Sequence, residues 1–557
     1  MCGQARKPGR ERLSNDEITN RPVLRRSRNR SARNPTVSSS HRRRRISGRR
    51  HAPKSADSGC GGANDTHRRR GSSPPTAKLD GTFTWEWRFG PRGTLMMQVD
   101  PRDAVFVYVE TPSANQTSVS TFAFDSGEHP EPSRDELLRW ITERAGRIGI
   151  LRQRMIRVPF DLDHPYWAED PAFAAEDHVV FHDGRGWEEL RTLLADIQRR
   201  PLNPSRPLWE IHVVTGVAGV AEIPGAATVV AIKMHHSMAD GGLGAKISRQ
   251  LFTENLPTDE RPAAVAAIPS RLSMAAAAVS SLPRNLCLLA GFVPRARRVQ
   301  RLMRAERAQG MYEAPAALRP RTVLNQPLGP ERVFDAVFFS VPELRAMRSA
   351  IGGVTVNDLM LTIVGSTMHR YLCEVDAVPD GSLAAGVPLS TRDAAEATSR
   401  NRFVTLAVDL HTDLPDLVER ARAIHATVLM DTVRKTGPGE TQFDALANSI
   451  PGFVVRNGLR VLGALPARQS STIRLANTLV TNVPKGPADM VLCGSTVAAN
   501  FGVAPLVGLG GVVHSVSSVG DSLAVNITAD PRQLRDDRRY AELLRESFED
   551  LKAAVYP

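Results

Sequence analysis

Short apolar runs alternate with amphipathic segments along most of this 557-residue chain, and this alternation limits its fold more than any other feature. Runs typical of strands begin near residue 95 and lie at 121–124, 179–183, 211–217 and 228–236. Segments with helical spacing of apolar residues lie between them, at 133–148, where Ser133 is a candidate cap, 186–200 and 242–252. Elements that alternate in this way pack as layers. The sequence therefore predicts an α/β fold with mixed sheets.

The second half of the chain repeats this pattern after a segment of different composition. Residues 256–330 are rich in Pro, Ala and Arg, and we interpret them as a helical linker. Beyond it, the sequence predicts a strand at 333–341, helices at 341–352, 354–372 and 532–555, and a hairpin that turns at Gly520-Asp521. The expected domains are 96–255 and 331–557, on either side of the linker.

Positive charge is concentrated at the amino terminus. Residues 1–70 contain 20 Arg and Lys against 5 Asp and Glu, while the rest contains 52 against 54. A wholly basic nucleic-acid-binding body is thereby excluded, and no specific nucleic-acid partner is expected. Residues 1–78 lack the apolar surface needed to fold, so we expect a disordered tail. A phosphate-binding arm, a solvated tail, an organelle transit peptide and an upstream extension reaching residue 95 all remain open for it.

Cysteine usage fits a reducing compartment, and hydropathy predicts no membrane-spanning segment. The five cysteines are scattered and form no CxxC pair, which argues against a disulfide scaffold and against a zinc ribbon. No run of 18 apolar residues occurs, so no transmembrane helix is expected, and the amino terminus lacks the apolar core of a secretory signal. The linker places apolar stretches beside arginines 295–307, which suits either a membrane-surface anchor or a solvated helix.

The segment HHSMADG, residues 235–241, is the strongest candidate for chemistry. It follows a strongly apolar predicted strand and precedes a glycine-rich helix start, where catalytic residues are common. A histidine there can act as a general base, and Asp240 can orient the ring or fix the loop. Metal ligation, a structural histidine pair and chance are the alternatives. Adjacent histidines on a strand point to opposite faces, which makes them poor chelators of one ion.

Several further segments give the chain a resemblance to a known family. HHSMADG matches the HHxxxDG signature of CoA-dependent acyltransferases and of peptide-synthetase condensation domains. The order and content of the other segments resemble bacterial wax ester synthase/diacylglycerol acyltransferases. These segments are MQVDPRDAVFVYVETP (97–112), PLNPSRPLWEIHVV (201–214), VTVNDLML (354–361), VPLSTRD (387–393) and TNVPKGP (481–487), in which Lys485 is an extra residue.

The resemblance implies a fold and a set of site residues. It implies two chloramphenicol-acetyltransferase-like domains with an active-site channel at their interface. It implies transfer of a long-chain acyl group from acyl-CoA to diacylglycerol or a long-chain alcohol, without a covalent intermediate, a metal or a cofactor. The residues expected to take part are His236 as general base, with His235, Asp240, Gly241, Asn357, Asp358 and Arg392 in supporting or substrate-binding roles, Arg392 as a partner of Asp240. Trp209 and its neighbours are expected to pack under the histidine strand.

Two other functions stay open. One is a condensation-like acyltransferase that takes its acyl group from a carrier protein, and the other is an inactive lipid-surface binding protein. The expected location is the cytoplasm, at the periphery of a membrane or a lipid droplet.

Overall fold

The computed structural model describes residues 96–557 apart from short gaps. The gaps are 126, 128–130, 185, 221–222, 262–267, 313–318, 392–399, 465–471, 474–475 and 507–509. The predicted tail, whether it ends at residue 78 or 95, lies outside the described residues.

A first six-stranded sheet carries the histidine signature, in the order β14-β15-β2-β7-β6-β5. Its strands are β2 (Thr117–Asp125), β5 (Val179–Asp183), β6 (Trp209–Val217), β7 (Ala227–His235), β14 (Val491–Leu492) and β15 (Ser495–Val503). Every residue of β7 is buried, because antiparallel neighbours cover both of its edges and both faces of the sheet are packed. Thr117 of β2 lies opposite His235, which fixes where the signature leaves the sheet.

A second six-stranded sheet has the order β11-β10-β13-β16-β17-β9. Its strands are β9 (Val333–Ser340), β10 (Ala384–Ser390), β11 (Phe403–Asp409), β13 (Thr478–Pro484), β16 (Val512–Val519) and β17 (Ser522–Ala529). The predicted hairpin is confirmed: β16 and β17 pair antiparallel, and Gly520 adopts the positive φ of 56° that its turn requires. Smaller sheets pair β1 (Met97–Gln98), β4 (Tyr166–Glu169) and β3 (Gln153–Ile156), and β8 (Arg319–Pro320) with β12 (Thr472–Ile473).

The second half of the chain contributes two strands to the first sheet. β14 and β15 come from the second half, yet β15 pairs antiparallel with β2 and so completes the first sheet. Residues 491–503, which the sequence placed within the domain 331–557, are therefore part of the sheet built mainly by residues 96–255. Alternation of apolar residues identifies a strand but says nothing of which sheet it joins.

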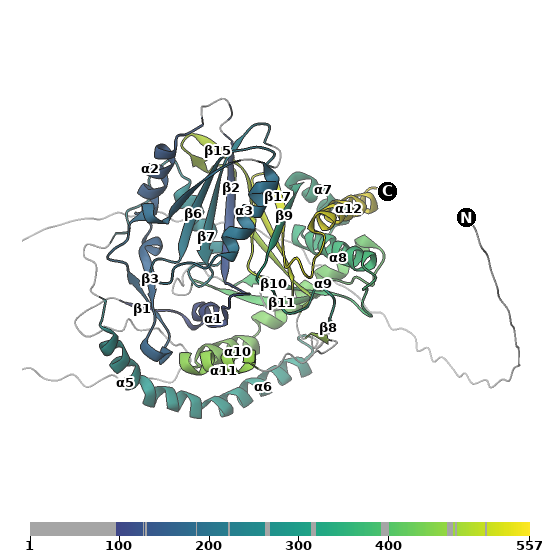
Figure 1. Ribbon diagram of the computed structural model, residues 1–557. Coiled ribbons are helices and arrows are strands. Elements are labelled where there is room, and N and C mark those ends of the chain that lie inside the picture. The colour runs from purple at the N-terminus through teal and green to yellow at the C-terminus, as the bar shows by residue number, and fades with distance from the viewer. Residues whose placement is uncertain are drawn as a thin grey trace, which may run out of the picture. The chain divides into compact units, whose positions relative to one another are not determined.

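Twelve α-helices surround the sheets in the described part of the chain (Figure 1). They are α1 (Pro101–Val109), α2 (Arg134–Ala145), α3 (Trp187–Arg199), α4 (Gly241–Leu251), α5 (Arg271–Ala290), α6 (Phe292–Ala308), α7 (Val341–Ile351), α8 (Val356–Glu374), α9 (Leu417–Thr436), α10 (Pro438–Asn448), α11 (Gly452–Ala464) and α12 (Asp537–Val555). Short 3₁₀ turns form η1 (Gly149–Arg152), η2 (Pro159–Asp161) and η3 (Ala175–His178).

Helix boundaries follow local chemistry. Ser133 caps α2 in a reciprocal capping box with Glu136, as the sequence predicts. The strand expected near residue 95 is only the two-residue β1, and a helix follows it directly. Asp100 accepts a hydrogen bond from the Arg102 amide, and Pro101 occupies the first turn, so this segment begins α1.

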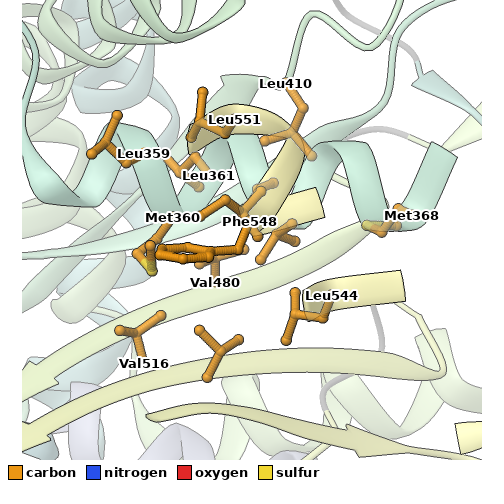
Figure 2. Packing of buried hydrophobic residues seen from close by; sticks show 14 of the residues in the cluster. Leu359, Met360, Leu361, Met368, Leu410, Val480, Val516, Leu544, Phe548 and Leu551 are labelled. Atoms are coloured by element: carbon orange, nitrogen blue, oxygen red, sulfur yellow. The ribbon is translucent and has the colours of Figure 1, made fainter. Parts of the chain in front are cut away.

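The core of the second half lies between its sheet and α8, α9 and α12. Leu359, Met360, Val480 and Phe548 meet there (Figure 2). The sequence predicts α8 as amphipathic, but it is buried without interruption from Asp358 to Met368. A helix that is enclosed on all sides loses its polar stripe.

The linker is helical, as predicted, and forms α5 and α6. Among the described residues α5 is the single helix that is long and apolar enough to cross a membrane, judged by length and composition only, and the bent pair α7 and α8 passes the same test together. The sequence predicts no such segment, because Ser280, Ser281 and Arg284 interrupt the apolar run of α5, whereas a mean over the whole helix still reaches the hydropathy of a span. Only a narrow face of α5 is buried, and α6 lies beside α10 (Figure 1), where Glu306 accepts a hydrogen bond from the Gly439 amide.

Candidate functional site

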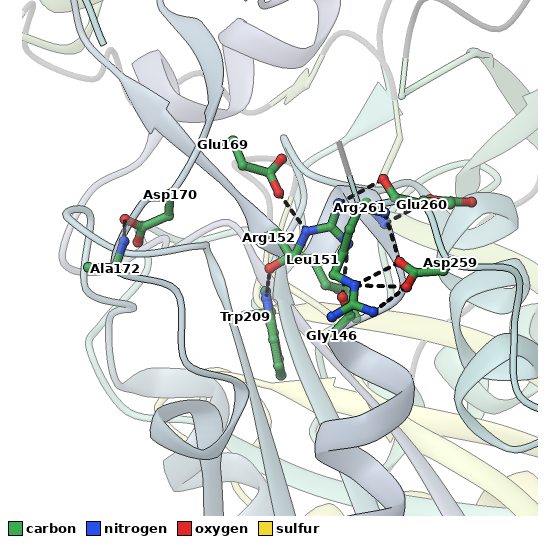
Figure 3. A network of polar contacts seen from close by, with 11 residues as sticks. Gly146, Leu151, Arg152, Glu169, Asp170, Ala172, Trp209, Asp259, Glu260 and Arg261 are labelled. Atoms are coloured by element: carbon green, nitrogen blue, oxygen red, sulfur yellow. Dashed lines mark hydrogen bonds and ion pairs between the residues drawn. The ribbon is translucent and has the colours of Figure 1, made fainter. Parts of the chain in front are cut away.

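The histidine signature leaves the first sheet at the end of β7. The His235 amide donates to the Leu208 carbonyl, and Trp209 begins β6 next to it. The Trp209 indole is buried, donates to the Leu151 carbonyl at 2.7 Å (Figure 3) and stacks on His178. The PLWE block thus supports the histidine strand by packing, as its sequence predicts.

His235 is held on both ring nitrogens. The Ser237 amide donates to its Nδ1 at 3.1 Å, and the Ser237 hydroxyl lies 2.7 Å from the same atom. Since an amide only donates, Nδ1 carries no proton in the neutral ring, and the proton is on Nε2, which lies 3.6 Å from Glu110 Oε2. Burial raises the pKa of Glu110, but its contact with His235 and the hydrogen bond that it accepts from the Gln116 amide outweigh burial and lower that pKa overall. Both ring nitrogens of His235 therefore contact residues that hold the loop.

His236 points to a different environment. Its ring stacks on Phe106, with centroids 4.2 Å apart and planes 12° apart, and Phe403 lies at 6.3 Å. Its amide donates to the Gln116 carbonyl at 2.7 Å. Its Nδ1 lies 2.9 Å from Asn401 Oδ1, and no described residue bonds to its Nε2. The ring is packed among side chains but keeps part of its surface accessible.

Asn401 and Asp103 fix the protonation pattern of this ring. The Asn401 amide nitrogen donates to Asp103 Oδ1 at 2.9 Å and to the His236 carbonyl at 2.8 Å. These two acceptors determine which end of the Asn401 side chain is nitrogen, so its oxygen faces His236. An amide oxygen only accepts, and the proton of neutral His236 therefore lies on Nδ1. Its Nε2 carries the lone pair and is the nitrogen able to accept a proton.

The electrostatics of the site favour a neutral imidazole. Burial lowers the pKa of His236, and the bond to Asn401 opposes this only in part. Burial also raises the pKa of Asp103 to about 6, although the Asn401 side chain and the Arg400 amide both donate to that carboxylate. A base that is neutral at neutral pH is ready to take a proton.

Asp240 lies at the start of α4 and clamps the neighbouring segment. Its carboxylate accepts from the Leu243 amide at 2.8 Å, as a helix cap, and from the Arg402 amide at 3.2 Å. Its own amide donates to the Arg400 carbonyl at 3.3 Å. Asp240 therefore acts on His236 through the segment that carries Asn401, whereas the ring itself is bonded by Asn401.

Gly241 allows two elements to approach each other. A Cβ at this position would lie 2.5 Å from Val483 Cγ2 on β13, the strand of the TNVPKGP block. The glycine thus lets the first turn of α4 rest directly against the second sheet.

The remaining predicted residues lie apart from this cluster or outside the described part of the chain. Asp358 forms a capping box with Thr355 at the start of α8 and bonds His425 of α9 at 2.8 Å. Asn357 is half-buried in the same first turn. No described contact joins either residue to the histidine loop. Arg392 falls in the gap at 392–399, outside the described residues.

Asp103, Glu110 and Asn401 were not predicted as site residues. The two carboxylates lie in the 97–112 segment, which the resemblance includes only as a starting block. Their spacing of seven residues puts them on the same side of α1 and its end, and this was a usable signal. Asn401 gave no signal, because it precedes β11 in an irregular segment 165 residues from His236.

The arrangement as a whole joins a base to an orienting amide and a buried carboxylate, from both halves of the chain. Chemically, a base held in this way is able to take a proton from a hydroxyl that attacks a carbonyl. No group of three or more potential metal ligands lies together among the described residues.

Comparison with known proteins identifies matching domains over most of the chain. The family model for the wax ester synthase/diacylglycerol acyltransferase catalytic domain matches residues 99–360, and the model for the C-terminal domain of the same family matches residues 400–552. Together they include β7, α4, Asn401 and β13.

Relatives and solved structures agree with these matches. A Mycobacterium tuberculosis protein named as a diacylglycerol O-acyltransferase is 26% identical over 83% of this chain and 91% of its own length. A Mycobacterium bovis protein with the same kind of name is 28% identical over 76% and 82%. The wax ester synthase/diacylglycerol acyltransferase of Marinobacter aquaeolei VT8 shares the fold, with a TM-score of 0.58, 19% identity, and coverage of 83% of this chain and 100% of that one. The first condensation domain of the calcium-dependent antibiotic synthetase shares it at a TM-score of 0.50 and 13% identity, with coverage of 82% and 98%.

Proposed function

Because the chain belongs to the wax ester synthase/diacylglycerol acyltransferase family, we propose that it moves a long-chain acyl group from acyl-CoA to a hydroxyl by direct, His236-based transfer. As a member of this family, the chain is an O-acyltransferase whose acceptor is diacylglycerol, an alcohol or both. The observation that carries the catalytic assignment is the bond from His236 Nδ1 to Asn401 Oδ1, since it leaves Nε2 as the free base.

The acceptor hydroxyl gives its proton to His236 Nε2 as its oxygen attacks the thioester carbonyl. A tetrahedral oxyanion forms, the carbon–sulfur bond then breaks, and the proton passes from His236 to the departing thiolate to give CoA thiol. Every proton and electron pair is accounted for without a covalent acyl-enzyme, a metal or a cofactor, because the thioester is already activated. General-base action of this kind contributes about 10²–10⁴-fold to the rate.

Asn401 and Asp103 support the charged intermediate. When His236 becomes an imidazolium, its Nδ1–H remains bonded to Asn401 Oδ1, and Asn401 is held in turn by Asp103. The carboxylate lies behind the amide and stabilises the positive charge in a poorly hydrated site. His235 contributes by holding the loop between Ser237 and Glu110.

The outer surface of α5 and α6 supports attachment to a lipid surface. Leu272, Val279, Leu286 and Val293 follow one another at intervals of seven residues, and all four are exposed. Phe160 on η2, which packs against α5, is 90% exposed and has a positive φ of 57°. An apolar stripe of this kind would insert among acyl chains.

Charge on α6 complements anionic headgroups. Arg297, Arg298, Arg301, Arg304 and Arg307 are exposed, while the helix's acidic residue, Glu306, is buried against Tyr312 and Gly439. Arginines beside an apolar stripe bind anionic membranes or droplet surfaces at their periphery. The enzyme would thereby work at the surface where its acceptor is dissolved, facing the cytoplasm.

Thiol release from palmitoyl-CoA tests the function. The full chain is incubated with diacylglycerol, with hexadecanol or without acceptor, and His236→Ala is measured alongside. We expect release that depends on the acceptor and is lost in the variant. Release from an acyl carrier protein thioester but not from palmitoyl-CoA would instead support a condensation-like enzyme, and no release from folded protein with either donor would support a lipid-binding role.

A further inference from the structure

A basic hollow of about 790 Å³ lies between α4 and the end of β13. The residues that line it from one face of α4 are Ala245, Lys246, Arg249 and Gln250, and those at the end of β13 and just beyond it are Pro484, Lys485 and Gly486. Along its rim lie Thr253, Asn255, Leu256, Pro257 and Thr258. None of the lining residues is an Asp or a Glu. The hollow is therefore a site of concentrated positive charge in a body whose overall charge is near neutral.

Lys485 is the unusual member of this set. The residue is 7% exposed, yet within the described part of the chain no carboxylate or other side chain bonds to its ammonium group. Burial alone lowers its pKa to about 8, since nothing nearby compensates for the lost hydration. Buried cations are normally paired, so a partner that arrives from solution is the simplest explanation of an unpaired one that lines a hollow.

Two further cations and the local backbone shape the hollow. Arg249 donates to the Lys485 carbonyl at 3.3 Å and pairs with Asp489 at 2.8 Å, which leaves it fixed at the wall. Gly486 has a φ of 93°, and a Cβ there would lie 3.1 Å from the Arg249 guanidinium. Lys246 is exposed one turn earlier on α4.

The hollow lies close to the reacting centre. α4 begins at Gly241, next to Val483, and Arg249 is eight residues further along the same helix, about 12 Å away at 1.5 Å per residue. The acyl donor has a matching form, because the pantetheine arm of CoA separates its thioester from a diphosphate and a 3′-phosphate.

We propose that the hollow formed by Lys246, Arg249 and Lys485 binds the phosphate groups of CoA and so selects free acyl-CoA as the donor. This inference rests on the proposed function, since it names where that donor is held. Lys485, the residue added to the TNVPKGP block, supplies the buried charge. A carrier-bound pantetheine has a single phosphate attached to a protein and would leave most of the hollow unfilled.

Binding of CoA and 3′,5′-ADP to the full chain, measured by calorimetry, tests the site without requiring turnover. We expect Lys485→Met to weaken both ligands by about tenfold or more, and Lys485→Arg to retain most of the affinity. At pH 8 CoA binding should take up protons in the wild type and not in Lys485→Met, because an anion raises the pKa of the lysine. Lys552→Met, on the outer surface of α12, is the matched control and should leave binding unchanged.

Kinetics then separate this site from the reaction itself. Lys485→Met should raise the KM for palmitoyl-CoA and leave turnover of palmitoyl-pantetheine, which has no phosphate, unchanged. It should not lower the melting temperature, since it removes a buried charge that has no partner. The proposal is overturned if Lys485→Met binds CoA with unchanged affinity. It is also overturned if this variant loses binding to phosphatidylglycerol vesicles while its affinity for CoA is unchanged. CoA binding without any acyl transfer would refute the proposed function while leaving the phosphate site standing.

Discussion

Asn401 determines which ring nitrogen of His236 carries the proton. Its amide nitrogen donates to Asp103 and to the His236 carbonyl, so its oxygen, 2.9 Å from Nδ1, has to accept the ring proton. The neighbouring His235 has the opposite tautomer, because the Ser237 amide donates to its Nδ1. Two adjacent histidines thus have different roles, and only one presents a free basic nitrogen.

Replacement of His236 by Ala is expected to lower kcat by at least about 10²-fold while the melting temperature changes little, since the ring is partly accessible. His235→Ala should instead lower the melting temperature, because it leaves Ser237 and Glu110 without their buried partner. Thermal unfolding and initial rates on the same preparations check both. An essential His235 together with a dispensable His236 would contradict the assignment.

Replacement of Asn401 by Ala is expected to reduce kcat by about 10²-fold, because the ring loses its orientation. The pH profile should move as well. The bond to Asn401 raises the pKa of His236 against the larger effect of burial, so its loss lowers that pKa further. A base is active when deprotonated, and burial already lowers the pKa of His236 in the wild type, so the acid limb of kcat/KM should move to still lower pH. A shift to higher pH would contradict the proposed bonding.

Gly241→Ala is expected to destabilise the protein by about 1–3 kcal/mol, since the new Cβ would overlap Val483. Val483→Ala removes the obstructing methyl groups and should restore part of that stability in the double variant. Urea unfolding of the two single variants and the double variant gives the coupling free energy. Additive effects would mean that Gly241 serves some purpose other than close packing.

Removal of three arginines from one face of α6, as Arg297→Gln, Arg301→Gln and Arg304→Gln together, is expected to weaken binding to anionic vesicles by about 3 kcal/mol. Co-sedimentation with phosphatidylglycerol vesicles measures this, and activity on a soluble acceptor should be retained. The matched control removes three exposed arginines on and beside α12, Arg535, Arg538 and Arg545. Equal losses in both variants would show that net charge, not the α6 surface, binds the vesicle.

Much of this fold was predictable because local chemistry determined it. The Ser133 cap, the Gly520 turn and the strand before His235 are each specified by residues a few positions apart. The packing role of Trp209 was predictable for the same reason, since its block directly precedes β6. Features that depend on distant partners were not predictable: the sheet that β15 joins is one, and the enclosure of α8, whose helix was itself predicted, is another.

The residues of the site divide in the same way, into those specified by neighbouring residues and those brought together from distant segments. His236 and Asp240 lie in one contiguous segment and were identified from it. Asn401 and Asp103 are brought to His236 from two other parts of the chain. The spacing of Asp103 from Glu110 is a local signal, whereas nothing in its local sequence distinguishes Asn401 from an ordinary polar residue. Of the two roles expected for Asp240, orienting the ring or fixing the loop, its bonds to the Leu243 and Arg402 amides correspond to the second, while Asn401 bonds the ring.

The pairing of β15 with β2 has a consequence for how the protein is made. Until residues 495–503 have left the ribosome, β2 is an open edge, and the sheet that carries the histidines is unfinished. Unpaired strand edges invite association with other chains. The sheet of the first half therefore stays incomplete until nearly all of the second half has been synthesised. A nascent chain stalled before β15 would be a natural client for chaperones, and expression of residues 96–255 alone would produce aggregates.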